Sequence, residues 1–118
     1  MIKQNLHCHT TFDDGADTPE AMVTAAVSAG LTSLGISAHS PVPGEVWCVS
    51  EENEPRFKAE LHRLREKYRG LIDVYCGLEY DSRSAQRFEG YDYVIASAHT
   101  LAGTTIDNTI EEARQVIE

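Results

Sequence analysis

Two histidines near the N-terminus, His7 and His9, carry the clearest chemical signal in this chain. Side chains alternate between the two faces of a β-strand, so both imidazoles can bind one metal ion while Cys8, which lies between them, points to the other face. For an isolated His-x-His, a pair of solvent-exposed histidines is an equally ordinary outcome. The potential ligands that follow later in the chain favour the metal site.

Those later ligands lie at the ends of the strands that the sequence predicts. Apolar runs predict strands at residues 5–8, 34–37, 72–78 and 92–97, and the last run is continuous enough to be buried on both faces. The first run ends in the His-x-His pair, and the others are followed in turn by His39, Glu79 and His99. Functional groups of β/α barrels gather at the carboxyl ends of the strands, so these side chains are expected to converge on one pocket.

Helices are predicted between the strands. A capped helix is expected from Thr18 until Gly30 stops it, and a second from Pro55 until Gly70 closes it, while a capping box predicts a last helix over residues 109–118. His62 lies among charged residues of the second helix and is expected to face solvent. The alternation predicts right-handed βαβ units, and because four strands alone do not close a barrel, an open doubly wound sheet also fits this pattern.

Composition limits the class of protein. The 118 residues are 42% hydrophobic, enough for one modest globular domain or part of one. A net charge of -9 argues against nonspecific binding to nucleic acid or to an anionic membrane. No apolar run approaches membrane-spanning length and the first residues are too polar for a secretory signal, so a cytoplasmic protein is expected. Cys8, Cys48 and Cys76 are widely spaced and odd in number, which favours reduced, structural thiols.

Four ordered motifs resemble the polymerase and histidinol phosphatase (PHP) domain family. They comprise residues 7–10 (His-Cys-His-Thr) with Asp14-Gly15, residues 35–39, residues 77–79 and residues 96–99, so the resemblance spans essentially the whole chain. Residues 92–99 look most like the histidinol-phosphatase branch. The resemblance implies an α/β fold in which residues 1–118 form the N-terminal portion, about four βα units, of a distorted seven-stranded β/α barrel truncated at its C-terminus.

The resemblance also implies a site with up to three divalent metal ions. His7, His9 and Glu79 would hold the first ion, Glu79 would bridge to a second bound by His99, and Asp14 and His39 would contribute to the third. Such ions lower the pKa of a bridging water and neutralise the phosphate that is attacked, which places Glu79 and His99 in the catalytic centre. Zinc, manganese and iron all suit imidazole and carboxylate ligands.

Two departures from the family pattern affect this site. Ala38 stands where the family often has an acidic residue, so His39 lacks that neighbour to orient it. The remaining family ligands, a histidine in the middle of the barrel and an Asp-x-His pair near its end, lie beyond the region that this chain covers. Each metal centre would lack one protein ligand, and the 118-residue chain alone is therefore expected to bind metal weakly and to lack phosphatase activity.

Other polar residues have weaker assignments. Arg83 follows Glu79 in a loop, together with Ser82 and Arg87, and its guanidinium is predicted to hold the substrate phosphate in a fork geometry. Trp47 either forms a wall of the pocket or packs under a long loop. Asp13 is expected to be a turn residue that stabilises the bend at Gly15.

The sequence is therefore interpreted as a metal-dependent phosphoesterase that hydrolyses a small phosphate monoester, namely histidinol phosphate to histidinol in histidine biosynthesis. Its partner would be the small phosphorylated substrate, with neither nucleic acid nor membrane involved. Four alternatives remain open: a PHP-type protein-tyrosine phosphatase, a PHP domain of a DNA polymerase, a catalytically inactive metal-binding module, and an assembly unit that pairs as a homo-oligomer through the open barrel edge.

Overall fold

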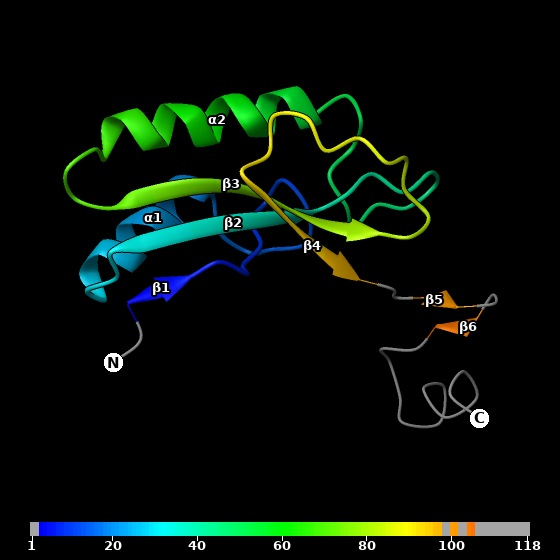
Figure 1. The fold of residues 1–118 in the computed structure, drawn as a ribbon, viewed down its shortest axis with the longest axis horizontal. Helices are drawn as coiled ribbons and strands as arrows, with labels where there is room; N and C mark the ends of the chain where they lie inside the picture. Colours follow the sequence, from blue (N-terminus) through cyan, green and yellow to red (C-terminus); the bar gives the residue numbers. More distant parts are fainter. Residues whose placement is uncertain (1–2, 98–99, 102–103, 106–118) are drawn as a thin grey trace.

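The structure, a computed structural model, describes residues 3–97, 100–101 and 104–105. Four parallel strands form one sheet in the order in which they occur in the chain (Figure 1). These strands are β1 (Gln4–Asn5), β2 (Ser33–His39), β3 (Asp73–Asp81) and β4 (Tyr93–Ser97). Two short strands, β5 (Thr100–Leu101) and β6 (Thr104–Thr105), pair with each other in an antiparallel manner outside this sheet.

Two helices connect the first three strands. α1 (Pro19–Ser28) begins where the Thr18 side chain accepts a hydrogen bond from the Ala21 amide at 3.2 Å. α2 (Glu54–Lys67) begins one residue before Pro55, and a proline there needs no amide hydrogen bond. Both predicted helices are confirmed, and neither is long and apolar enough to cross a membrane.

The two helices pack against each other on one face of the sheet (Figure 1). Glu20 of α1 accepts three hydrogen bonds from the α2 side. The donors are Lys67 and Arg63 of α2, at 2.5 and 3.3 Å, and the hydroxyl of Tyr68, which directly follows α2, at 2.9 Å. Consecutive parallel strands joined by right-handed connections place their helices on the same face. The open doubly wound sheet is therefore wrong, and the strand order is that of part of a β/α barrel.

The apolar core lies between the sheet and these helices. Side-chain direction reverses at each residue along a strand. Every second residue of β2 and of β3 therefore points toward the helices. Phe57 of α2 is fully buried there and packs edge-to-face against Phe12 at a ring distance of 5.5 Å. The buried members are Val23, Ala26, Leu34, Ile36, Ala38, Val49, Phe57, Leu61, Leu64, Ile72, Val74 and Cys76.

On the opposite face of the sheet, the ring of Tyr93 lies across two glycines of neighbouring strands. A Cβ atom added to Gly35 would lie 2.3 Å from the Tyr93 Oη, and one added to Gly77 would lie 2.2 Å from its Cζ. We call Gly35 and Gly77 the glycine cradle. The Tyr93 hydroxyl crosses it and donates a hydrogen bond to the Leu6 carbonyl at 2.5 Å, which ties β4 to the residue directly before His7.

The strand boundaries differ from those predicted. β1 ends at Asn5, but the chain beyond it still runs beside β2, where the Ser37 amide donates a hydrogen bond to the Cys8 carbonyl at 3.0 Å. β2 and β3 extend far enough to include His39 and Glu79, which the sequence placed just after strands. The helix predicted over residues 109–118 lies outside the described residues.

The prediction that the fourth strand is buried on both faces is wrong. Residues of β4 alternate between half-buried and exposed, and the Val94 side chain on the helix side is 40% exposed. The connection from β3 to β4, residues 82–92, contains no helix, so nothing equivalent to α1 or α2 covers this strand among the described residues. An apolar run predicts burial only if a neighbouring element covers each face.

Candidate metal centre

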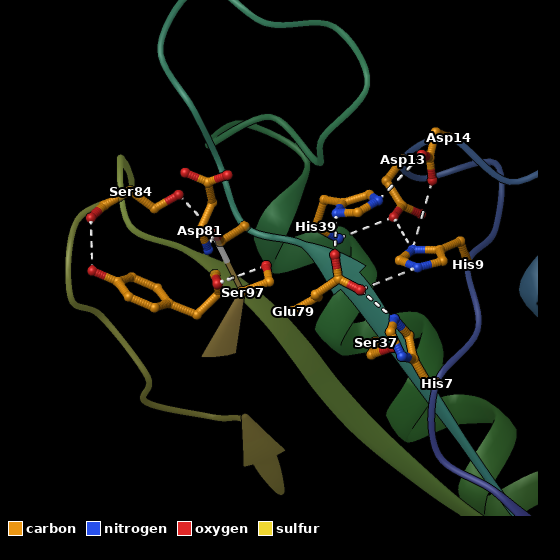
Figure 2. A network of polar contacts seen from close by, with 12 residues as sticks. His7, His9, Asp13, Asp14, Ser37, His39, Glu79, Asp81, Ser84 and Ser97 are labelled. Atoms are coloured by element: carbon orange, nitrogen blue, oxygen red, sulfur yellow. Dashed lines mark hydrogen bonds and ion pairs between the residues drawn. The ribbon is translucent and has the colours of Figure 1, made fainter. Parts of the chain in front are cut away.

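The segment that follows β1 brings His7 and His9 to one side of the chain, where both face Glu79 (Figure 2). A close contact joins His7 Nε2 to Glu79 Oε1, and His9 Nε2 lies 3.5 Å from the same oxygen. Cys8 points the other way, with its Sγ 3.4 Å from the Gly35 carbonyl. The alternation predicted from sequence is therefore present, although this stretch is extended chain beyond the end of β1.

Glu79 occupies the centre of the cluster. Its register partner in β2 is His39, so the two side chains meet at the carboxyl end of the sheet. The Glu79 side chain is only 5% exposed, with Oε1 directed at the N-terminal histidines and Oε2 2.8 Å from His39 Nδ1. A carboxylate buried to this degree needs cationic or hydrogen-bonding partners, and its two oxygens face two separate sets of potential ligands.

Asp14 and His39 form the second set of potential ligands. His39 Nε2 lies 3.2 Å from Asp14 Oδ2, and the rings of His39 and His9 stack with centroids 4.3 Å apart. The Asp14 side chain is 45% exposed, so it lies on the solvent side of the cluster. The turn that presents it requires Gly15, because a Cβ there would lie 2.4 Å from the His9 carbonyl carbon. His9 Nδ1 also lies 3.6 Å from Asp14 Oδ1, so His9 contacts both sets and joins them into one continuous site.

Asp13 has a larger role than the turn residue that the sequence suggested. Its side chain is fully buried, and Oδ2 lies 2.7 Å from His9 Nδ1. This hydrogen bond raises the pKa of His9 above its ordinary value. Burial alone would raise the pKa of Asp13, but hydrogen bonds from His9 and from two backbone amides hold it below its usual range. In the sequence, Asp13 stands four residues after His9. That spacing predicts a side-chain contact in a helix but not in a loop, so the contact could not be predicted before the turn was known.

The neighbour that His39 lacks in the sequence is replaced by this same carboxylate. Ala38 faces the core and is fully buried, so its side chain makes no contribution at the site. The His39 amide instead donates a hydrogen bond to Asp13 Oδ2 at 3.0 Å. This hydrogen bond joins the end of β2 to the loop after β1.

Arg83 is paired with an internal carboxylate. Its Nε and Nη2 donate to Asp81 Oδ1 and Oδ2 at 3.0 and 3.1 Å, and the Asp81 side chain is buried. The guanidinium carbon lies 5.5 Å from the Trp47 ring centroid, and the Trp47 ring meets His39 edge-on at 5.2 Å. Trp47 therefore lies between Arg83 and the candidate ligand His39. Arg87 pairs with the exposed Glu51 instead.

The described ligands suit a divalent cation. Two groups have ligand atoms within 4.8 Å of one another, and they consist of His7, His9 and Glu79, and of His9, Asp13, Asp14 and His39. Imidazole nitrogens with carboxylate oxygens are the donors that zinc, manganese and iron take in proteins. His99, the remaining predicted ligand, lies outside the described residues, and His62 is exposed on α2 as predicted.

Comparisons with known proteins identify the family of this chain. The model of the PHP domain matches residues 5–116. A protein of Deinococcus radiodurans named "Probable histidinol-phosphatase" is 32% identical over 114 residues, covering 86% of this chain and 44% of that protein. The histidinol-phosphatase of Bacillus subtilis is 26% identical over 91 residues, covering 69% of this chain and 34% of that protein.

A solved structure shares the fold. It is the histidinol phosphate phosphatase of Lactococcus lactis, complexed with zinc, L-histidinol and phosphate, with a TM-score of 0.73 and 25% sequence identity. The match covers 96% of this chain and 49% of that protein. This chain thus spans half or less of the length of the relatives that it matches.

Proposed function

Because this chain belongs to the PHP domain family, we propose that it forms the N-terminal part of a metal-dependent phosphatase that hydrolyses histidinol phosphate to histidinol. The observation that carries the proposal is the position of Glu79, a buried carboxylate whose two oxygens face the His7–His9 pair and His39. The names of the relatives, and the zinc, L-histidinol and phosphate bound in the Lactococcus structure, support this substrate.

Each ligand has a proposed place. His7, His9 and Glu79 would hold one ion, Asp14 and His39 would contribute to another, and Glu79 would bridge toward an ion held by His99. Divalent ions bound there would polarise the phosphate and lower the pKa of a water molecule. Since both Glu79 oxygens already face imidazoles, Glu79 would serve as a metal ligand shared between the two sets and not as a general base.

The protein side chains would also orient the substrate. Arg83 is proposed to contact the phosphate, with Asp81 holding its guanidinium in a fixed direction and Trp47 supporting it. Nε and one hydrogen of Nη2 are engaged with Asp81, so the contact to phosphate would come from Nη1 and the second hydrogen of Nη2. The three free thiols fit a reducing compartment, and we place the protein in the cytoplasm.

A substrate panel tests the proposal. Phosphate release is measured from L-histidinol phosphate, a phosphotyrosine peptide and a nucleotide with added manganese or zinc. The assay uses both the 118-residue chain and the longest polypeptide that its gene encodes. We expect the 118-residue chain to release no phosphate, and the longer polypeptide to prefer histidinol phosphate and to lose turnover in the Glu79→Gln variant. Asp73→Asn, which removes an exposed carboxylate at the other end of β3, is the matched control and should be fully active.

The outcomes separate the alternatives. Preference for the phosphotyrosine peptide would assign the protein to the tyrosine-phosphatase branch, and activity retained by Glu79→Gln would reject this metal centre. Tight metal binding without turnover of any substrate would support the inactive module. Turnover by the 118-residue chain only as a dimer would support the assembly unit, which light scattering can establish.

A further inference from the structure

One buried charge in the centre has no role in the proposed reaction. The Asp13 side chain is fully buried between the loop after β1 and the end of β2. Each carboxylate oxygen accepts a backbone amide hydrogen bond, Oδ1 from Thr10 at 3.1 Å and Oδ2 from His39 at 3.0 Å. Oδ2 also meets the His9 ring (Figure 2). Burial of a carboxylate is unfavourable unless the charge is paired or hydrogen-bonded. The Asp13 carboxylate meets this condition between two predicted metal ligands, His9 and His39.

These contacts determine which nitrogen of His9 can bind a metal. An ionised carboxylate only accepts hydrogen bonds, so Nδ1, 2.7 Å from Asp13 Oδ2, must carry the proton. Nε2 is then the nitrogen with a lone pair, and it lies 3.5 Å from Glu79 Oε1. A histidine that donates its second nitrogen to a carboxylate is held in one tautomer and one ring orientation, which increases its basicity as a ligand.

The same carboxylate also sets the relative position of the two ligand-bearing segments. Thr10 lies directly after His9 in the chain, and the His39 amide belongs to the last residue of β2. By accepting from both amides, Asp13 fixes the distance between the loop after β1 and the end of β2. The His9 and His39 rings, carried by these two segments, stack with centroids 4.3 Å apart.

We propose that Asp13 is a positioning residue that locks His9 in the Nδ1–H tautomer and joins the two segments that carry His9 and His39. The proposal rests on the proposed metal-dependent function, because it assigns His9 Nε2 to an ion. It also differs from the simpler view that Asp13 is itself a ligand. Both Asp13 oxygens are taken up by backbone amides that belong to the fold, which favours positioning over ligation.

The test starts with the metal-free wild-type chain, since this requires no variant to fold. Long-range ¹H–¹⁵N NMR spectra of the histidine rings, recorded above the pH at which His9 titrates, should show His9 protonated at Nδ1. The opposite tautomer would overturn the proposal. This measurement does not depend on activity, so it remains decisive even if the chain hydrolyses no phosphate ester.

The Asp13→Asn variant then separates positioning from ligation. The asparagine side chain has one accepting oxygen and a donating NH2 group, whereas both oxygens of Asp13 accept hydrogen bonds. The Nδ1–H of His9 therefore loses its charged acceptor, and we expect His9 to shift toward the Nε2–H tautomer. Manganese affinity, measured by calorimetry, should fall on the order of 10- to 100-fold with the number of ions per chain unchanged. Asp73→Asn, a matched loss of one charge far from the centre, should alter neither quantity. Loss of one whole ion per chain, or an unchanged His9 tautomer in Asp13→Asn, would contradict the proposal.

If the longest polypeptide that the gene encodes binds no manganese, the proposed function fails at that point, and the tautomer of the metal-free chain still decides whether Asp13 locks His9. Thermal unfolding of each variant provides the control for folding. The two conclusions are therefore distinguishable by experiment.

Discussion

The substitution Gly77→Ala should destabilise the protein by forcing Tyr93 out of the glycine cradle. The added Cβ would lie 2.2 Å from Tyr93 Cζ, whereas carbon atoms pack at about 3.5 Å or more, so the ring must move by about 1.3 Å. Overpacking of this kind costs about 1–3 kcal/mol, and loss of the hydrogen bond to the Leu6 carbonyl adds about 0.5–1.5 kcal/mol. Lower entropy of the unfolded chain offsets about 0.4–1 kcal/mol. The expected loss in the free energy of unfolding is about 0.5–4 kcal/mol.

Denaturant unfolding measures this loss, and a double-mutant cycle identifies its cause. In a Tyr93→Leu background the ring is absent, so Gly77→Ala should cost much less than it does in the wild type. Manganese affinity should also fall in Gly77→Ala, on the order of 10-fold, because the Leu6 carbonyl directly before His7 is no longer held. Equal costs in the two backgrounds would show that the clash with Tyr93 is not what destabilises the variant.

Three further predictions concern other parts of the molecule. Phe57→Ala should lower the free energy of unfolding by about 3–5 kcal/mol in denaturant melts, because Phe57 is fully buried; a loss below 1 kcal/mol would contradict its place in the core. Ion pairing lowers the pKa of Glu20 to about 2 from 4.5, so its stabilising effect should be complete above pH 4.5 and lost as the pH falls toward 2. Melts of Glu20→Gln and wild type from pH 7 to pH 2 should therefore converge, and a constant difference would count against the ion pairs with α2. Arg83→Ala should lower kcat/KM for histidinol phosphate with the metal content unchanged, whereas unchanged kinetics would mean that Arg83 only pairs with Asp81.

Local patterns predicted most of the helices and strands, and the convergence of most of the candidate ligands. The spacing of His7 and His9 identified their common direction because an extended chain alternates sides whether or not it is paired as a strand. His39 and Glu79 were found because parallel strands carry functional groups at their carboxyl ends. These inferences depend only on the alternation of side chains along an extended chain and on where each strand ends. Both can be read from the order of residues in the sequence.

What could not be predicted depends on contacts between distant segments. The role of Asp13 arises only when the turn after His9 folds against the end of β2, and the sequence shows no sign of that meeting. The glycine cradle requires the register of β3 and β4, which pairs Gly77 with Tyr93. Exposure of Val94 depends on the absence of a covering helix over β4 among the described residues, a property of its neighbours and not of its own apolar run.

The contact between Trp47 and His39 has a practical consequence for spectroscopy. Trp47 is the only tryptophan in the chain, and its ring lies edge-on to a predicted metal ligand at 5.2 Å. Excitation at the red edge of the absorption band therefore selects a single fluorophore adjacent to the centre. Binding of a paramagnetic ion such as manganese should quench its emission, while zinc should change its intensity by altering the charge of the neighbouring imidazole. The protein thus carries an intrinsic optical reporter, by which occupancy of the centre can be followed in real time without a label.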